Sequence, residues 1–307
     1  MDNFFLIFAS FILGFGLKFS SRFPSNSHKV LNAFVICVSF PAVVFLNIPK
    51  LFQTTVFDFK VIIPISMAWI TFGLSWLVFG QLGKYKKWSK ARTGAIILTA
   101  GLGNTSFVGL PLLDALVGKE AVSWGILIDQ LGSFLVLSTL GLTIAAKYGH
   151  SNSIKDRSIL KQVVLFPPFM ALVLSSIIGL FNIEYPQMLF SSINILAQTL
   201  VPLALFAVGF QLKISTNVLR RYWKVLCVGL AFKLIFIPTI LLGFYYSITG
   251  EIDFILKVTI LEAAMATMIT SAVVASDFNL DEELANLMVG ISIPISLISV
   301  PLWNYFL

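Results

Sequence analysis

Long hydrophobic runs without a charged residue dominate the chain, and their lengths predict membrane-spanning helices. A helix needs about 20 apolar residues to cross about 30 Å of hydrocarbon. Six runs approach or exceed that length: residues 30–48, 61–83, 93–113, 162–183, 185–212 and 284–307. Residues 3–17 form a shorter run, which Lys18 can complete by snorkelling. Three further runs each carry one ionisable residue: 121–146 with Asp129, 225–246 with Lys233, and 258–276 with Glu262. The pattern predicts an all-α membrane protein with ten transmembrane helices.

Composition excludes the main classes of soluble protein. Apolar residues make up 58% of the 307 residues and charged residues only 11%, against about 25% charged in a typical soluble domain. A soluble globule could not hide so much apolar surface. Two cysteines, Cys37 and Cys227, lie inside apolar runs, so a disulfide scaffold is excluded as well.

The positions of the positive charges explain the net charge of +7. Sixteen of the 21 Lys and Arg residues fall in the odd-numbered loops between the predicted spans, and the even-numbered loops carry only Lys50, Lys60, Lys119 and Lys257. Cytoplasmic loops of membrane proteins are enriched in Lys and Arg. We therefore expect an integral protein of the bacterial inner (plasma) membrane with both termini outside the cytoplasm. Nucleic acid is not expected as a partner.

The middle of the chain carries its most polar linker, residues 147–161, with five predicted spans on each side. A duplicated unit with an odd number of spans inserts its second copy upside down. The spacing of Pro41, Phe45 and Leu51 recurs in the second half at Pro202, Phe206 and Leu212. Coincidence among apolar residues is the alternative. We predict two five-helix units, residues 1–149 and 150–307, that form a 5+5 inverted repeat, as is common in secondary transporters.

The fourth span contains a cluster of helix-breaking and polar residues. These are Gly101, Gly103, Asn104, Thr105, Ser106, Gly109 and Pro111. A helix in lipid cannot leave backbone groups unpaired, but a discontinuous helix that lines a cavity can turn its freed groups toward a solute or ion. A small-residue face for close helix packing is the alternative. Three consecutive polar side chains favour the discontinuous helix.

The stretch Gly103–Pro111 resembles the fourth-helix signature of the auxin efflux carrier family of permeases. Similar segments follow at Lys233–Leu234 with Pro238, at residues 262–265, and at residues 294–296 and 301–303. The resemblance covers essentially the whole chain. It implies that helices 4 and 9 are broken and cross at the bilayer midplane, that the substrate is an organic anion such as auxin, malonate or malate, and that the protein is a homodimer. The family commonly has Pro after the methionine of the ninth span, where this chain has Ala266.

Together these features predict a division between a scaffold and a transport core. Spans 1, 2, 6 and 7 would form the scaffold, and spans 3–5 and 8–10 the mobile core. At the crossing, Asn104, Thr105 and Thr267 would donate hydrogen bonds to a carboxylate, aided by the partial positive charge of half-helix N-termini. Lys233 is either a further substrate ligand or part of a structural ion pair.

A coupling-ion site is predicted beside the crossing. Asp129, Ser133, Asn104 and Glu262 offer several oxygen ligands, and Ser133 shares a helix face with Asp129. Such a group suits sodium, held by Glu262 and Asp129; alternatively one of the carboxylates carries a proton. Resemblance to the sodium–bile-acid symporters, which place a Glu just before the same crossing, favours a cation at Glu262. The alternative is that the ammonium of Lys233 replaces the cation.

We therefore expect a carrier that moves a small organic anion by alternating access, in secondary active transport coupled to sodium or protons. The lipid bilayer and the substrate are its partners, and no cofactor beyond the coupling ion is expected. The alternative is a membrane sensor or receptor that binds its ligand without moving it. An enzyme is not expected, because His28 and His150 fall in loops and the chain carries no metalloprotease, CxxC, P-loop or dinucleotide motif.

Overall fold

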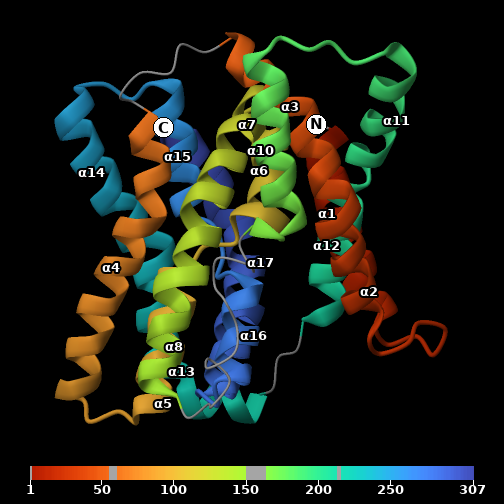
Figure 1. Ribbon diagram of the computed structural model, residues 1–307. Coiled ribbons are helices and arrows are strands. Elements are labelled where there is room, and N and C mark those ends of the chain that lie inside the picture. Colours follow the sequence, from red (N-terminus) through yellow and green to blue (C-terminus); the bar gives the residue numbers. More distant parts are fainter. Residues whose placement is uncertain (1, 55–60, 150–163, 213–215) are drawn as a thin grey trace. The chain divides into compact units, whose positions relative to one another are not determined.

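A computed structural model describes residues 2–54, 61–149, 164–212 and 216–307 of the chain. This part of the chain is built of helices, and its one β-type pairing is an isolated antiparallel bridge between Gly103 and Thr267 (Figure 1). The chain divides into two compact units. Unit 1 comprises Met1–Val61, Ser106–Ile126 and Val163–Leu212, and unit 2 comprises Ile62–Thr105, Leu127–Gln162 and Lys213–Leu307.

Unit 1 is a group of helices in which α1 packs along α12, and α10 and α11 pack against α3 (Figure 1). Its elements are α1 (Asp2–Leu17), α2 (Ser27–Phe34), η1 (Val35–Ser39), α3 (Phe40–Thr54), α6 (Leu110–Leu116), α7 (Lys119–Leu127), α10 (Pro167–Leu180), α11 (Gln187–Gln198) and α12 (Leu200–Gln211). Here α2, η1 and α3 follow one another without a gap. The π-type segment η1 adds one wide turn to an otherwise continuous helix.

Unit 2 holds the third predicted span and the last three. Its elements are α4 (Ile62–Tyr85), α5 (Lys90–Gly101), η4 (Ile128–Phe134), η5 (Leu137–Gly141), α8 (Leu142–Tyr148), α13 (Thr216–Ala231), η6 (Phe232–Phe236), α14 (Ile237–Thr249), α15 (Phe254–Ala263), α16 (Ile269–Asp277) and α17 (Glu282–Phe306). Helix α4 packs against α5, η4 and α15. The short η3 (Thr105–Gly109) begins at the last residue of this block of unit 2 and leads into α6 of unit 1.

Several helix starts in unit 2 follow from short polar side chains in the sequence. Ser89 accepts a hydrogen bond from the backbone N–H of Arg92, and Asp253 accepts one from Leu256. Asp281 caps α17 in the same way. Such N-caps satisfy backbone donors that the first helical turn leaves without a partner.

Six helical stretches in the described part of the chain are long and apolar enough to cross a membrane. They are Ser27–Gln53, Ile62–Tyr85, Lys119–Tyr148, Gln187–Gln211, Asn217–Thr249 and Glu282–Phe306, and three apolar helices of 10–17 residues accompany them: Phe5–Leu17, Thr105–Leu116 and Pro167–Leu180. The prediction of an all-helical membrane protein is confirmed at this level. The count of ten membrane crossings and the inverted repeat stay predictions.

Non-helical backbone interrupts two of the predicted spans, at residues 102–104 and 264–268. Residues 93–113 are divided among α5, η3 and α6, and residues 258–276 between α15 and α16. These are the fourth and ninth predicted spans. The predicted boundary between the two repeats, at residues 149 and 150, borders a stretch that lies outside the described residues, so the division into repeats stays a prediction.

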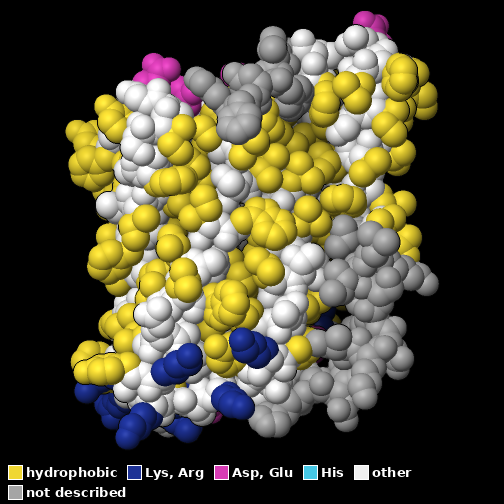
Figure 2. All heavy atoms as spheres, turned by 60° about the vertical axis from the view of Figure 1, so that its left-hand side comes forward, with side chains coloured by type: hydrophobic (Ala, Val, Ile, Leu, Met, Phe, Trp, Pro, Cys, Tyr) yellow, Lys and Arg dark blue, Asp and Glu magenta, His cyan; other side chains and the backbone are white. Residues whose placement is uncertain are grey.

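The charged side chains of unit 2 are segregated along its helices. Lys and Arg gather where α4 ends and α5 begins, as Figure 2 shows in dark blue. They include Lys84, Lys86, Lys87, Lys90 and Arg92. Between this end and the opposite one, the side chains that the view shows on α4 and its neighbours are largely hydrophobic (Figure 2). An apolar flank with a basic end is what a bilayer and the positive-inside rule require.

Candidate functional site

Within unit 2, two extended segments meet where α5 and α15 have ended. Helix α5 ends at Gly101, and Leu102 is extended with φ −117° and ψ 125°. The backbone N–H of Asn104 donates to the carbonyl of Ala266 at 2.7 Å, and the N–H of Met268 donates to the carbonyl of Leu102 at 3.0 Å. We call this antiparallel contact of residues 102–104 with residues 266–268 the crossing. It lets backbone groups released from two helices pair with each other inside the protein.

Small side chains let the backbone approach so closely here. A Cβ atom added to Gly103 would lie 3.0 Å from Lys233 Nζ and 3.6 Å from the carbonyl oxygen of Glu262. A Cβ atom on Gly101 would lie 2.9 Å from the ring of Phe72 on α4. Gly101 and Gly103 therefore serve close packing as well as the interruption of the helix.

The other two predicted helix-breaking residues follow the crossing along the chain. Gly109 ends η3, and its backbone is still in the right-handed helical region. Pro111 is the second residue of α6 and lies inside the helical stretch Thr105–Leu116, where it removes a backbone donor directly after the π-type turn η3. Both residues thus lie after the chain has become helical again.

The ninth span is interrupted without a proline. Helix α15 ends at Ala263 and α16 begins at Ile269. The backbone N–H of Thr267, between them, donates to the hydroxyl of Ser292 on α17 at 2.9 Å. A side chain of a neighbouring helix therefore satisfies a donor that the interruption releases.

The three residues predicted to bind substrate are buried in unit 2, with Asn104 2% exposed and Thr105 and Thr267 fully buried. Thr105 donates its hydroxyl hydrogen to Asp129 Oδ1 at 2.5 Å. Because a hydroxyl has one hydrogen to donate, Thr105 is committed to this carboxylate. The hydroxyl of Thr267 has no hydrogen-bond partner among the described residues. The backbone and the side chain of Thr267 therefore play different parts at the crossing.

Asp129 is held by two neighbouring side chains. It is 3% exposed within η4, where Oδ1 accepts from Thr105 and Oδ2 accepts from the amide of Gln130 at 2.6 Å. Gln130 is fully buried, and its Oε1 has no partner in the described part of the chain. Ser133, four residues after Asp129, is 1% exposed, and the structure gives its hydroxyl no partner among these residues either.

Glu262 lies on α15, which leads into the second segment of the crossing, and Lys233 lies on η6. Glu262 is in the last turn of α15 and is fully buried, with no hydrogen-bond partner for either carboxylate oxygen among the described residues. It interacts electrostatically with both Asp129 and Lys233. Lys233 is 1% exposed, and its ammonium donates to the carbonyl of Ala263 at 3.3 Å. Ala263 is the last residue of α15, where a helix carries partial negative charge, so this position suits an ammonium.

The site thus concentrates buried oxygen atoms without partners, counted over the described residues. They are Gln130 Oε1, Ser133 Oγ, Thr267 Oγ1 and both carboxylate oxygens of Glu262. Each buried polar group left without a hydrogen bond costs about 1–3 kcal/mol. No set of three or more His, Cys, Asp and Glu side chains is close enough to hold a metal in the described chain, so a cation here would need hydroxyl, amide or backbone oxygens in addition to the carboxylates.

Sequence reasoning missed two of the contributing residues, Gln130 and Ser292. Gln130 follows Asp129 directly, and a second polar residue in an apolar run was a usable signal. Ser292 lies in a charge-free span and is distant in sequence from Thr267, so no local pattern connects the two.

Comparison with known proteins assigns the chain to a family. The model of the family described as membrane transport protein, the auxin efflux carrier and permease family, matches residues 1–304. The chain belongs to this family. An uncharacterized transporter of Methanocaldococcus jannaschii is 26% identical over 314 residues, covering 100% of this chain and 98% of its own length. An uncharacterized transporter of Methanothermobacter thermautotrophicus is 27% identical over 298 residues, with 96% and 94% covered. The uncharacterized transporter YfdV of Escherichia coli K12 is 23% identical over 304 residues, with 96% and 93% covered.

Membership identifies the protein as an integral membrane protein of a transporter family. The resemblance noted on the stretch Gly103–Pro111 is confirmed, and the match runs through the segments of α15 and α17 that also carried it.

Proposed function

We propose that the protein is a carrier that moves a small organic anion across the bilayer and binds the anion's carboxylate at the crossing. The observation that carries this proposal is the buried antiparallel pairing of residues 102–104 with residues 266–268. Two helical segments begin there, Thr105–Leu116 and Ile269–Asp277. Helix N-termini carry partial positive charge and free N–H groups, so two of them beside one buried point suit an anion.

In this proposal the side chains at the crossing have different roles. Asn104 and Thr267 donate to the substrate, and the hydroxyl of Thr267 is without another partner among the described residues. Thr105 instead orients Asp129. Lys233 adds a positive charge within a few ångströms of the Gly103 backbone and favours a carboxylate without contacting it directly.

The proposal extends to the arrangement of the transmembrane helices. In this proposal ten helices form a 5+5 inverted repeat whose fourth and ninth members are broken. Spans 1, 2, 6 and 7 form the scaffold of a homodimer in the inner membrane, and spans 3–5 and 8–10 move against it to expose the site to each side in turn.

A coupling ion completes the proposal. The carboxylate of Glu262 and the oxygens of Gln130 and Ser133 lie buried without partners in the described chain, which favours a ligand that brings positive charge. Sodium prefers such oxygen ligands, and a proton on Glu262 would satisfy the same need. Lys233 bonds to the carbonyl of Ala263 and forms no ion pair with Glu262 within the described residues, so in this proposal the ammonium does not replace the cation.

Purified protein in liposomes tests the proposal with radiolabelled malate and malonate as probes. We expect saturable uptake and exchange of internal for external substrate. In Asn104→Ala, the exchange rate should fall at least about tenfold, because a lost hydrogen bond to a charged group is worth about 1.5–3 kcal/mol. Asn286→Ala is the matched control, since that amide contacts Glu282 at an exposed position and should leave exchange unchanged.

Other outcomes identify other functions. Unsaturable flux would indicate a channel. Saturable binding without any movement of label would indicate a sensor built on a transporter fold. Normal exchange in Asn104→Ala would remove the site from the crossing. The same liposomes, with sodium and pH gradients imposed separately, test coupling: one gradient should drive uptake, and Glu262→Gln should abolish that dependence. Uptake that ignores both gradients would show that the carboxylates are structural.

A further inference from the structure

The end of unit 2 where α4 and α8 finish carries a group of polar and aromatic side chains that take no part in the crossing (Figure 1). Trp76, Gly80 and Lys84 follow one another at four-residue steps on α4 and therefore share one face of that helix. Lys147 lies in the last turn of α8, and Tyr148 is the final residue of the same helix. We call these five residues of unit 2 the α4–α8 patch.

Two contacts join the two helices within the α4–α8 patch. The ammonium of Lys147 lies 5.4 Å from the centre of the Trp76 ring, within the usual range of a cation–π interaction. A Cβ atom added to Gly80 would lie 3.8 Å from the hydroxyl oxygen of Tyr148 and 3.7 Å from Cδ1 of Trp76. Gly80 therefore places no side chain between the indole of one helix and the phenol of the other.

Carboxylates do not neutralise the positive charges of the α4–α8 patch. Lys84 and Lys147 are both exposed, and neither forms an ion pair with another described residue. Asp281 and Glu283, at the start of α17, pair with arginines instead. The hydroxyl of Tyr148 has no hydrogen-bond partner in the described part of the chain. Two ammonium groups and one hydroxyl donor are thus available to an anion.

The α4–α8 patch also borders the surface that faces lipid. Helix α4 is one of the stretches long and apolar enough to cross a membrane, and Lys84 lies in its last turn. Trp and Tyr are enriched at the level of lipid headgroups. Toward the middle of α4, Leu77 and Val78 are 58% and 42% exposed, so acyl chains can cover them beside Trp76. Figure 2 shows the same order on unit 2, with Lys and Arg at one end and hydrophobic side chains next to them.

We infer that the α4–α8 patch binds the headgroup of an anionic phospholipid from the adjacent leaflet. Lys84 and Lys147 contact the phosphate, the hydroxyl of Tyr148 donates to one of its oxygens, and the acyl chains lie along the apolar part of α4. Lysine is a common phosphate ligand, and basic pockets between transmembrane helices bind anionic lipid headgroups. The inference rests on the protein lying in a membrane and not on the proposed function.

Native mass spectrometry of the full chain in detergent tests the preference for an anionic headgroup. Phosphatidylglycerol and the zwitterionic phosphatidylcholine, with the same acyl chains, are titrated separately. We expect phosphatidylglycerol to bind at least about tenfold more tightly, because each lysine should contribute about fivefold, which corresponds to about 1 kcal/mol. Lys84→Gln together with Lys147→Gln should bring the two dissociation constants close to each other. Equal constants in the starting protein, or an unchanged preference in this double variant, would overturn the inference.

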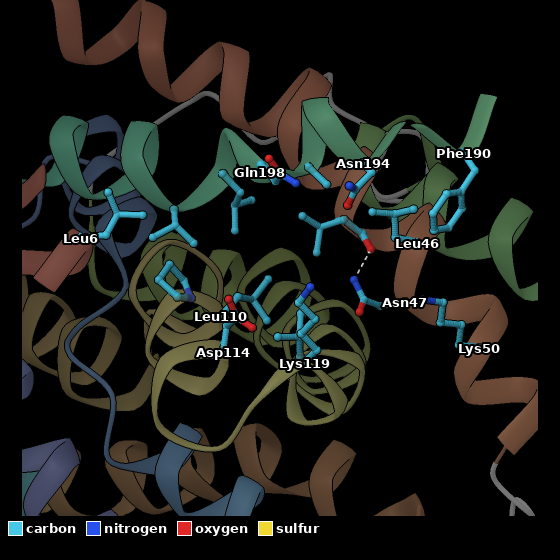
Figure 3. A pocket seen from close by; sticks show the side chains of 16 residues that line it. Leu6, Leu46, Asn47, Lys50, Leu110, Asp114, Lys119, Phe190, Asn194 and Gln198 are labelled. Atoms are coloured by element: carbon cyan, nitrogen blue, oxygen red, sulfur yellow. Dashed lines mark hydrogen bonds between the residues drawn. The ribbon is translucent and has the colours of Figure 1, made fainter. Parts of the chain in front are cut away.

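Two control variants separate a built site from general attraction by positive charge. Lys87→Gln removes an exposed charge from the turn after α4, at the same end of unit 2 but outside the α4–α8 patch. Lys119→Gln removes a charge that interacts with the carboxylate of Asp114 on the wall of a cavity in unit 1 (Figure 3). Both variants should keep the preference for phosphatidylglycerol. A loss in either control as large as that in the Lys84 and Lys147 double variant would contradict a specific site.

Brominated lipids locate the bound molecule, because bromine quenches tryptophan fluorescence only at short range. In nanodiscs of phosphatidylcholine, a small fraction of brominated phosphatidylglycerol should quench more than the same fraction of brominated phosphatidylcholine. Trp76→Phe retains an aromatic ring next to Lys147 and should remove this excess quenching. Excess quenching that persists in Trp76→Phe would place the lipid elsewhere and overturn the inference.

Inorganic phosphate distinguishes a lipid site from a site for a soluble anion. It offers charged oxygens without acyl chains, so an equimolar amount should leave phosphatidylglycerol bound. Displacement of phosphatidylglycerol at equal concentration would show that the acyl chains contribute nothing and that the ligand is a soluble anion. A normal elution profile in size-exclusion chromatography verifies that each variant is folded.

Discussion

At the scale of single residues, the ninth span shows how hydrogen bonds can stabilise a helix interruption that contains no proline. The family commonly has Pro where this chain has Ala266, yet α15 still ends at Ala263. The backbone N–H of Thr267 is directed to Ser292, and that of Met268 to Leu102. Hydrogen bonds to other elements therefore stabilise a break that proline would otherwise impose by removing a donor.

The hydrogen bond between Thr267 and Ser292 predicts that removing the Ser292 hydroxyl lowers the stability of the protein. Ser292→Ala leaves the buried N–H of Thr267 without an acceptor, which should destabilise the protein by about 1–3 kcal/mol and lower its thermal midpoint in detergent. Ser296→Ala is the matched control, because Ser296 is also fully buried on α17 but donates only to Ile293 in its own helix. Equal midpoints for the two variants would contradict this account of the break.

The residues of the candidate site differ in how visible they were in the sequence. Three polar residues lie inside apolar runs: Asn104, Asp129 and Glu262. Because a polar or charged side chain is costly to bury in a membrane, they were recognisable as candidate functional residues. The hydrogen bond from Thr105 to Asp129 was not predictable in the same way, because residues 24 apart in the sequence come together only in the folded chain. Polarity marks a candidate residue, whereas its partner is decided by the fold.

At the scale of elements, close contact between α1 and α12 depends on two glycines. A Cβ atom on Gly14 would lie 2.1 Å from the carbonyl oxygen of Phe206, and one on Gly209 would lie 2.2 Å from that of Phe11. These are contacts with backbone, which cannot turn aside as a flexible side chain can. In a bilayer, such close approach is a main source of helix association, because burial from water contributes little.

The contact predicts opposite outcomes for two neighbouring glycines of α1. Gly14→Ala should force α1 and α12 apart and destabilise the protein by about 1–3 kcal/mol, the usual cost of overpacking. Gly16→Ala should be neutral or slightly stabilising, because its Cβ would meet no atom within 4 Å and alanine favours helix. Thermal unfolding of both variants in the same detergent decides the matter. A lower midpoint for Gly16→Ala than for Gly14→Ala would refute the packing.

At the scale of the whole molecule, the distribution of charge sets the orientation in the membrane. Lys and Arg are concentrated in the odd-numbered loops, and within unit 2 they gather where α4 ends and α5 begins. Insertion retains such loops on the cytoplasmic side. The same bias predicts that the amino and carboxyl ends both lie outside the cytoplasm.

Reporter fusions in Escherichia coli test this orientation. Alkaline phosphatase fused after Leu307 should be active, and green fluorescent protein at the same position should be dark, because each reporter folds on one side only. The same reporters fused after Gly149, in an odd-numbered loop, should give the reverse pattern. Fluorescence at the carboxyl end would mean an odd number of spans or an inverted orientation, and would overturn the ten-span topology.

The sequence by itself determined that the protein is helical, that it lies in a membrane, and which family it belongs to. Each of these follows from properties that add up along the chain: the length of apolar runs, the positions of charges, and the motif Gly103–Pro111. It also marked the fourth span as discontinuous, because glycine, proline and three adjacent polar residues weaken a helix locally.

Only the tertiary structure decided which of these residues face one another. The pairing of Gly103 with Thr267, the bond of Lys233 to the end of α15, and the cavity beside Lys119 all join segments that are distant in sequence or come from several helices. Apolar periodicity says that a helix is buried but not against which neighbour, since lipid tails and helix surfaces are equally apolar. Selectivity for a substrate and a coupling ion depends on such contacts, because they decide which polar groups face one another.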